Sequence, residues 1–299
     1  KYRIAGIVYL LFLQVSTVEA QLQTARQVIS PYRNLFVKPS DQVPTTVAVD
    51  APLLGNGYVA ATIGGMPEQQ YYYLARNDFW RLKSGFNESF PAVLGKLQIS
   101  IPALKEASYR VEQDLYNAVT IASFSKGGTS VGVRSIMAAT KDWLIIEVHN
   151  NGSSTITGDA MLLLPGNDQF HVNPPLENKF PDTTASGQNK NGVQWMQRGF
   201  IKDVDMSTMA AAACKILNHQ SNQFSVAPGQ TIRIVCAVSG NFKSENSLSL
   251  VQQQVQRATV NEIEKVKQQH LQWWRRFWNE SYIDIADSVI EQQYYKSQY

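Results

Sequence analysis

The chain has 299 residues, of which 44% are hydrophobic and 10% aromatic, and its 27 basic and 24 acidic residues give a net charge of +3. This composition supplies enough apolar side chain for a sizeable core and excludes an intrinsically disordered chain. The charges are interspersed, so the sequence lacks the basic stripe through which proteins bind nucleic acid. We therefore expect one large domain or two ordinary ones, and no nucleic-acid partner.

Residues 1–20 have the pattern of a secretory signal peptide. Lys1 and Arg3 precede the apolar run 4–13, and Val18-Glu19-Ala20 resembles a cleavage site with small residues. The apolar run is about half the roughly 20 residues that a membrane helix needs, so we expect no membrane span after cleavage. The sequence thus predicts a protein that is secreted or periplasmic.

A hairpin punctuated by glycine precedes a polar and aromatic cluster. The triplet Gly55-Asn56-Gly57 predicts a tight turn, and short strands are expected at 58–63 and 71–74. Asn77, Asp78 and Trp80 come at the end of the second strand. An amide, a carboxylate and an indole are the groups that sugar sites use, because they supply hydrogen bonds to hydroxyls and a flat apolar face.

We therefore name Asn77, Asp78 and Trp80 as candidate substrate-binding residues. The alternative, which the residue chemistry leaves open, is a buried Trp80 beside an ordinary Asn-Asp turn.

From about residue 45 to 240 the sequence is a series of short apolar runs separated by Gly, Asn, Pro and Ser. The clearest runs are 96–101, 118–125, 130–138, 143–150, 156–164, 209–217 and 231–238. So many short runs in about two hundred residues predict a large antiparallel β-sandwich. The continuous apolar run 144–148 is typical of a central strand covered on both faces.

The interval 165–192 contains four prolines and little periodicity, so it is predicted to be a long loop. Its titratable residues, Asp168, His171 and Asp182, have no spacing that makes them a catalytic set. The four histidines of the chain show no metal-ligand spacing with each other or with cysteine, and we expect neither a metal nor a cofactor.

Cys214 and Cys236 lie in neighbouring predicted strands. In an exported protein they could form one disulfide, and in apolar segments they could equally be two buried free thiols.

The character of the sequence changes at Ser247. From there, apolar residues recur at intervals of three or four residues, with one interval of five. This spacing predicts a single amphipathic helix of about 25 residues that lies on a folded surface. It continues into 270–281, where four large aromatics occur within six residues. We interpret them as core residues that anchor the helix to the sandwich, in preference to ligand contacts.

A last helical pattern begins at Ile283. It places Glu291, Tyr294, Tyr295 and Tyr299 at spacings of one, three and four residues. We expect their packing partner to lie outside this sequence.

Three motifs together resemble the N-terminal part of glycoside hydrolases related to family 95, a group with α-L-fucosidases and galactosidases. They are Leu54-Gly55-Asn56-Gly57, Asn77-Asp78-Phe79-Trp80, and the helix ending in His270-xx-Trp273-Trp274-xx-Phe277-Trp278. The resemblance covers about residues 45–299. The fucosidase members carry Asn-Glu where this chain has Asn77-Asp78, which argues against transferring fucose specificity.

The resemblance implies a mainly β fold in which a large antiparallel sandwich is followed by helices. The expected parts are a β-sandwich at 21–245, a helical linker with a Trp-rich junction at 246–282, and at 283–299 the start of a truncated (α/α) six-hairpin barrel. In the family that barrel carries the catalytic carboxylates, which flank the scissile bond at about 5 to 9.5 Å separation. We therefore assign no catalytic residue to this chain, and the resemblance implies that Asn77, Asp78 and Trp80 help to hold a sugar at the barrel mouth.

The leading hypothesis is the N-terminal domain of an exported glycoside hydrolase, which acts on glycans, contacts a missing C-terminal barrel and is inactive alone. An alternative is a non-catalytic carbohydrate-binding sandwich that stacks sugars on Trp80, Trp143 or Trp195. A third hypothesis is a structural or adhesion domain without a sugar ligand.

Overall fold

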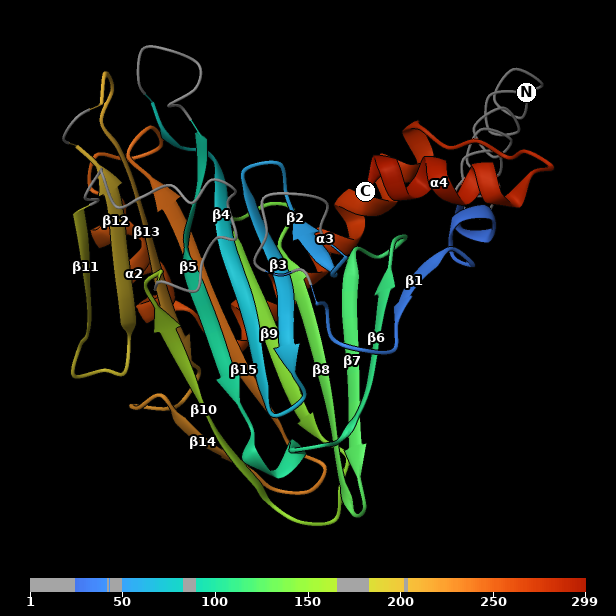
Figure 1. The fold of residues 1–299 in the computed structure, drawn as a ribbon, viewed down its shortest axis with the longest axis horizontal. Helices are drawn as coiled ribbons and strands as arrows, with labels where there is room; N and C mark the ends of the chain where they lie inside the picture. The colour runs from blue at the N-terminus through green and yellow to red at the C-terminus, as the bar shows by residue number, and fades with distance from the viewer. Residues whose placement is uncertain (1–24, 42, 44–49, 83–89, 166–182, 202–203) are drawn as a thin grey trace, which may run out of the picture.

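The computed structural model describes residues 25–41, 43, 50–82, 90–165, 183–201 and 204–299. Within this part the strands form a nine-stranded and a six-stranded antiparallel sheet that face each other as a β-sandwich (Figure 1). This confirms the mainly β fold expected from the sequence. The predicted signal peptide, and the residues Asp168, His171 and Asp182, lie outside the described residues.

The larger sheet has the strand order β1-β6-β7-β8-β9-β15-β13-β12-β11. In that order its strands are Arg33–Phe36, Ser108–Asp114, Val119–Lys126, Thr129–Met137, Trp143–Asn150, Thr231–Gly240, Thr208–Ile216, Gln194–Phe200 and Thr183–Gln188.

The smaller sheet has the order β14-β10-β5-β4-β3-β2. Its strands are Gln223–Val226, Ile156–Leu163, Phe90–Ser100, Gln69–Arg81, Val59–Met66 and Leu53–Gly55. Each of the seven runs named from the sequence falls largely on one of the strands of these two sheets.

One part of the predicted long loop is a strand instead. Thr183–Gln188 forms β11 at the edge of the larger sheet, where it pairs with β12. All its side chains are exposed, so the strand has no apolar alternation that the sequence could reveal. The prediction of a loop at 183–188 was therefore wrong.

The main core lies between the two sheets. On β8, Val131, Val133 and Met137 face this core, whereas Ile136 lies on the opposite face. The run 144–148 forms most of β9 and is covered on both faces, as predicted: Leu144 and its alternate neighbours join the main core, and Ile145 packs beneath helices.

The helices that cover the outer face of the larger sheet are α2 (Ser247–Arg257) and α3 (Val260–Glu280). The sequence predicted one continuous helix here, and that was wrong. The first helix ends at Arg257, with Ala258 as its C-cap. Thr259 caps the second helix, because its hydroxyl accepts a hydrogen bond from the Glu262 amide at 3.2 Å. Thr259 and Glu262 are spaced like a capping box, and that spacing was a local sign of the break.

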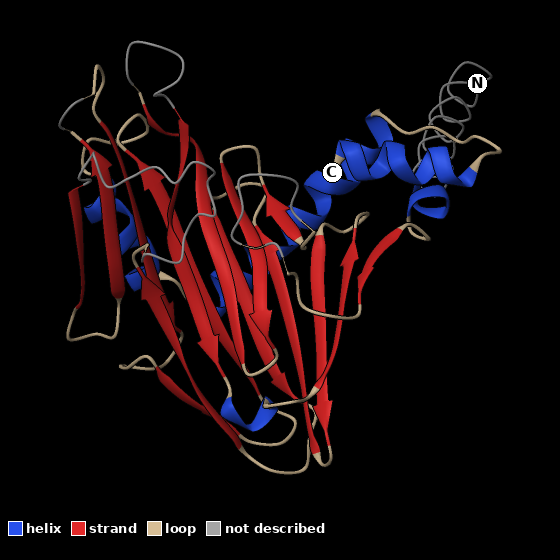
Figure 2. Cartoon of the chain, viewed as in Figure 1, coloured by secondary structure: helices blue, strands red, loops and turns tan. Residues whose placement is uncertain are grey.

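A third cluster of buried residues joins the C-terminal helices to one end of the sandwich. Figure 2 shows these helices gathered at one corner, where α4 (Ser288–Gln298) lies beside the end of α3. Trp278 of α3 and Tyr295 of α4 are both fully buried, and their ring centroids are 5.6 Å apart. Trp274 and Trp278 thus anchor the helix, as predicted, whereas Trp273 is 41% exposed and is not a core residue. The expectation that Tyr295 packs only on a missing partner was wrong.

In the part of the chain that the structure describes, no helix is long and apolar enough to span a bilayer.

Candidate functional site

The turn between β2 and β3 has the tight geometry predicted from its glycines. Gly57 adopts a φ of 86°, a left-handed conformation that favours glycine. The Asn56 side-chain oxygen accepts hydrogen bonds from the Tyr58 and Val59 amides at 3.0 and 2.8 Å. The turn therefore holds Asn56 in a fixed orientation beside the end of β4.

The candidate residues Asn77, Asp78 and Trp80 lie within β4, which continues to Arg81, and not beyond the strand's end as expected. The register of β4 against β5 shifts between Ala75 and Trp80, so this stretch is irregular. Such an irregularity changes the direction in which the side chains of the strand point. The structure thus brings the three residues to one end of the sandwich, which we call the rim.

Trp80 is exposed at the rim, with 37% of its surface accessible. Its indole nitrogen donates to the backbone oxygen of Asn77 at 2.8 Å, and the Asn77 side-chain amide donates to the Gly57 oxygen at 2.7 Å. The ring is therefore held by its polar edge while part of its apolar surface faces solvent. The alternative of a buried Trp80 is excluded.

Asp78 forms a two-pronged ion pair with Arg76. Arg76 Nε and Nη2 donate to the two Asp78 carboxylate oxygens at 2.8 and 2.9 Å. The Arg76 side chain is buried, whereas 26% of the Asp78 side chain remains accessible. Such a geometry fixes the carboxylate and leaves some of its lone pairs available to a ligand.

The same arginine reaches the turn between β8 and β9. Arg76 Nη1 donates to Asp142 Oδ2 at 3.2 Å, and Lys243, after β15, donates to the same oxygen at 2.6 Å. Asn56 Nδ2 contacts Asp142 Oδ1 at 3.1 Å. We call Asn56, Arg76, Asp78, Asp142 and Lys243 the polar clamp, because they join both sheets at the rim.

The charges of the clamp are mutually stabilised. Burial alone would lower the pKa of Arg76, but the hydrogen bonds and charges of Asp78 and Asp142 outweigh it and raise that pKa. Burial would raise the pKa of Asp142, but Lys243, Asn56 and Arg76 lower it. Arg76 and Asp142 are therefore ionised at neutral pH, and neither is a ready source of a transferable proton.

The two other tryptophans that the sequence suggested as sugar-stacking platforms are partly or fully buried. Trp143 is only 2% exposed, so the prediction that it is a sugar-stacking platform was wrong. Trp195 is half-buried and packs against the helix-covered face of the larger sheet. Its ring also covers Gly187, where an added Cβ would lie 2.8 Å from Trp195 Cζ2.

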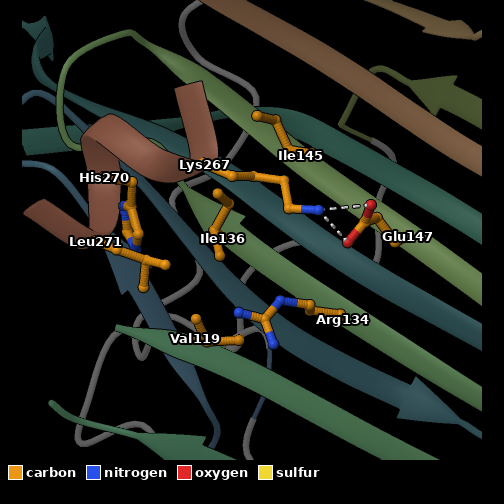
Figure 3. Close-up of a pocket in the computed structure, with 8 residues that line it drawn as sticks. All are labelled: Val119, Arg134, Ile136, Ile145, Glu147, Lys267, His270 and Leu271. Atoms are coloured by element: carbon orange, nitrogen blue, oxygen red, sulfur yellow. Dashed lines mark hydrogen bonds and ion pairs between the residues drawn. The ribbon is translucent and has the colours of Figure 1, made fainter. Parts of the chain in front are cut away.

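A small hollow lies between α3 and the strands β7, β8 and β9 (Figure 3). Lys267 bridges to both carboxylate oxygens of Glu147 at 2.9 and 3.0 Å, and Arg134 and His270 line other walls. Its volume of about 30 Å³ admits only a water or two. The hollow therefore has no room for a sugar.

Among the described residues, no group of three or more His, Cys, Asp or Glu side chains is arranged to hold a metal ion.

The sequence identified the exposed members of the rim but missed the clamp behind them. Arg76 interrupts an apolar strand two residues before Asp78, and this spacing was a local hint of an ion pair. The participation of Asp142 and Lys243 depends on contacts between distant segments, which no local pattern reveals.

No family model matches the sequence, and no curated protein matches it. Among solved structures, the chain is similar to a candidate kojibiose phosphorylase from human microbiome, with a TM-score of 0.50 and 8% sequence identity. The match covers 84% of this chain and 38% of that chain. At this identity the similarity concerns the fold, and the chain spans well under half the length of the solved protein.

Proposed function

We propose that this chain is the non-catalytic β-sandwich part of an exported glycoside hydrolase, and that it holds a glycan at the rim. The observation that carries the proposal is the presentation of Trp80, whose indole is fixed by its nitrogen while its surface is exposed beside Asp78. A rigid aromatic surface next to a fixed carboxylate suits the apolar face and the hydroxyls of a sugar ring.

Neighbouring residues enlarge this surface. Tyr58 is exposed and accepts a backbone hydrogen bond from Asn77 at 3.0 Å. Phe242 is exposed two residues after Gly240, whose Cβ position lies 3.2 Å from Asp78 Oδ1. The rim therefore offers three exposed aromatic rings on segments that meet around one carboxylate.

The fold comparison agrees with this proposal at a coarse level, since the similar solved protein is named for a reaction on a sugar and this chain matches only part of it. Among the described residues of the rim, Asp78 is joined by one other carboxylate, that of Asp142, which already binds Arg76, Lys243 and Asn56. Asp142 is therefore not available as a second catalytic carboxylate. In this proposal hydrolysis belongs to a helical barrel beyond this chain, and the rim contributes to substrate binding.

Glycan binding by the folded chain tests the proposal. The wild-type protein should retain one or more oligosaccharides from a panel of plant, bacterial and animal glycans, and Trp80→Ala should weaken that binding tenfold or more, a loss of about 1.4 kcal/mol. The matched control is Trp273→Ala, because Trp273 is 41% exposed but lies on α3. Equal loss in both variants, or no loss in Trp80→Ala, would remove the rim as the binding site.

The gene distinguishes the enzyme from a free-standing carbohydrate-binding sandwich. A reading frame that continues into paired amphipathic helices with Glu and Asp in their loops supports the hydrolase. A frame that stops soon after the codon for Tyr299 supports binding without catalysis.

A further inference from the structure

A larger cavity, of about 320 Å³, lies beside α2. We call it the α2 cavity. Its walls come from the start of β9, the end of β15, α2 and the first turn of α3, and it includes Asp142 and Lys243 of the polar clamp. A volume of this size is at the lower end of the range for small-molecule sites.

The charges that line the α2 cavity leave one cation uncompensated. Lys141 is paired with Glu262, and Lys243 with Asp142. Arg257, in the last turn of α2, has no ion pair among the described residues. The lining therefore has a local charge of one positive unit, which suits a ligand with one negative charge.

The neutral lining groups can bind hydroxyls. Gln254 accepts from Trp143 Nε1 at 3.0 Å through its oxygen, so its amide hydrogens remain available as donors. Gln253 donates to Ser249 Oγ at 3.0 Å through its nitrogen, so its oxygen remains available as an acceptor. The cavity thus offers both a donor and an acceptor on one face of α2.

Ser239 adds an unpaired polar group. It is 2% exposed and lines the cavity, yet its hydroxyl has no hydrogen-bond partner among the described residues. A buried hydroxyl without a partner costs free energy that a ligand hydroxyl could recover. The cavity therefore combines an unmatched cation with unmatched hydrogen-bonding groups.

We propose that the α2 cavity binds a small polyhydroxylated carboxylic acid, of the size of a hexuronate, with its carboxylate on Arg257 and its hydroxyls toward Ser239, Gln253 and Gln254. A neutral sugar leaves Arg257 unmatched, and a simple inorganic anion leaves the hydroxyl-binding groups unmatched. Asp142 and Lys243 of the polar clamp line this cavity, but the proposed ligand contacts include none of Asn77, Asp78 and Trp80, so the site is distinct from the glycan-binding surface proposed at Trp80.

Calorimetric titration of the folded chain with glucuronate tests this site, with glucose and inorganic phosphate as comparison ligands. We expect saturable binding of glucuronate, and binding at least tenfold weaker for glucose and for phosphate. Arg257→Gln and Ser239→Val should each weaken glucuronate binding at least fivefold. The control Arg275→Gln removes an exposed arginine of α3 that does not line the cavity and should leave binding unchanged.

Absence of saturable glucuronate binding would overturn the proposal, as would equal binding by wild type and Arg257→Gln. Phosphate binding as tight as glucuronate binding would show that the cavity recognises charge alone and would also overturn it. Trp80→Ala should keep full glucuronate binding, so loss in that variant would place the acid at the rim instead.

Discussion

Arg76 and Asp78 are joined by two parallel hydrogen bonds, of 2.8 and 2.9 Å, at the end of β4. The residue expected to contact sugar is therefore also a structural partner of a buried cation. A substitution of Asp78 should therefore have two effects, one on the stability of the fold and one on sugar binding.

Asp78→Ala should lower the free energy of unfolding by about 2 kcal/mol, because it removes one carboxylate from the buried Arg76. The loss is below that of a fully buried pair, since Asp78 is partly exposed and Asp142 still contacts Arg76. Urea denaturation measures it. As a control, Asp41→Ala breaks a pair in which both side chains are largely exposed and should not move the midpoint measurably. Equal midpoints for the two variants would contradict the structural role of Asp78.

The sequence predicted those parts of the fold whose patterns are local. Strands such as β8 alternate or run apolar in ways that follow from burial on one or two faces. β11 has no such pattern because an exposed edge strand is specified by its partner β12. The break between α2 and α3 was visible only as a capping box, which a periodicity count passes over.

The residues of the candidate site also fall into two groups, those that a local sequence pattern reveals and those that only the fold brings together. Trp80 and Asp78 were identifiable from residue chemistry at a strand end. The clamp was not, because Asp142 meets Arg76 only when the turn after β8 is brought to the end of β4 by sheet packing. The α2 cavity likewise depends on how a helix lies on the sheet.

His270 should make stability depend on pH. It is buried on α3, where its Nδ1 accepts from the Ala139 amide at 3.2 Å and its Nε2 donates toward the Asn117 and Ala118 oxygens at 3.0 and 3.1 Å. Burial, with a smaller contribution from the charge of Arg134, lowers the pKa of His270. The folded protein thus holds this ring neutral.

Because the folded pKa lies below the ordinary value, the unfolded chain binds the extra proton first as pH falls. The stabilisation is full above about pH 6.5 and is lost as pH falls below that value, with a slope of at most about 1.4 kcal/mol per pH unit. Urea unfolding at pH 7.5 and 5.5 should show the loss for wild type and a smaller one for His270→Gln. An equal slope in wild type and His270→Gln would refute the assignment.

Cys214 and Cys236 should resist alkylation in the folded protein. They are directly opposite each other on β13 and β15, fully buried, and both are free thiols. The hydrogen bond with Cys236, together with burial, raises the pKa of Cys214 well above its usual range, so little thiolate forms.

Mass spectrometry after iodoacetamide treatment at pH 8 checks this. The native protein should gain no adduct, and protein unfolded in urea without reductant should gain two. Labelling that requires a reductant would instead show a disulfide, the other outcome that the sequence left open.

Trp278 should be the main anchor between the C-terminal helices and the sandwich. It is fully buried, its ring lies 5.0 Å from that of Phe277 and 5.6 Å from that of Tyr295, and its nitrogen donates to the Leu115 oxygen at 3.1 Å. Trp278→Ala should therefore cost about 3 to 5 kcal/mol of the free energy of unfolding. Trp278→Phe keeps part of the ring but leaves a small cavity and loses the hydrogen bond to the Leu115 oxygen, which still accepts from the Ala118 amide at 3.3 Å, so it should cost about 1 to 3 kcal/mol.

Trp273 supplies the matched control, because Trp273→Ala removes the same side chain from the same helix at a position that is 41% exposed, and so loses less buried surface than Trp278→Ala. Hydrogen exchange should show faster exchange of α4 amides in Trp278→Ala and unchanged exchange in Trp273→Ala. Equal exchange in the two variants would mean that α4 is held by other contacts, such as that between Tyr32 and Glu291. A selective effect at α4 would show that this helix depends on the sandwich within this chain, because Trp278 reaches Leu115 at the end of β6 and Tyr295 through the same buried ring.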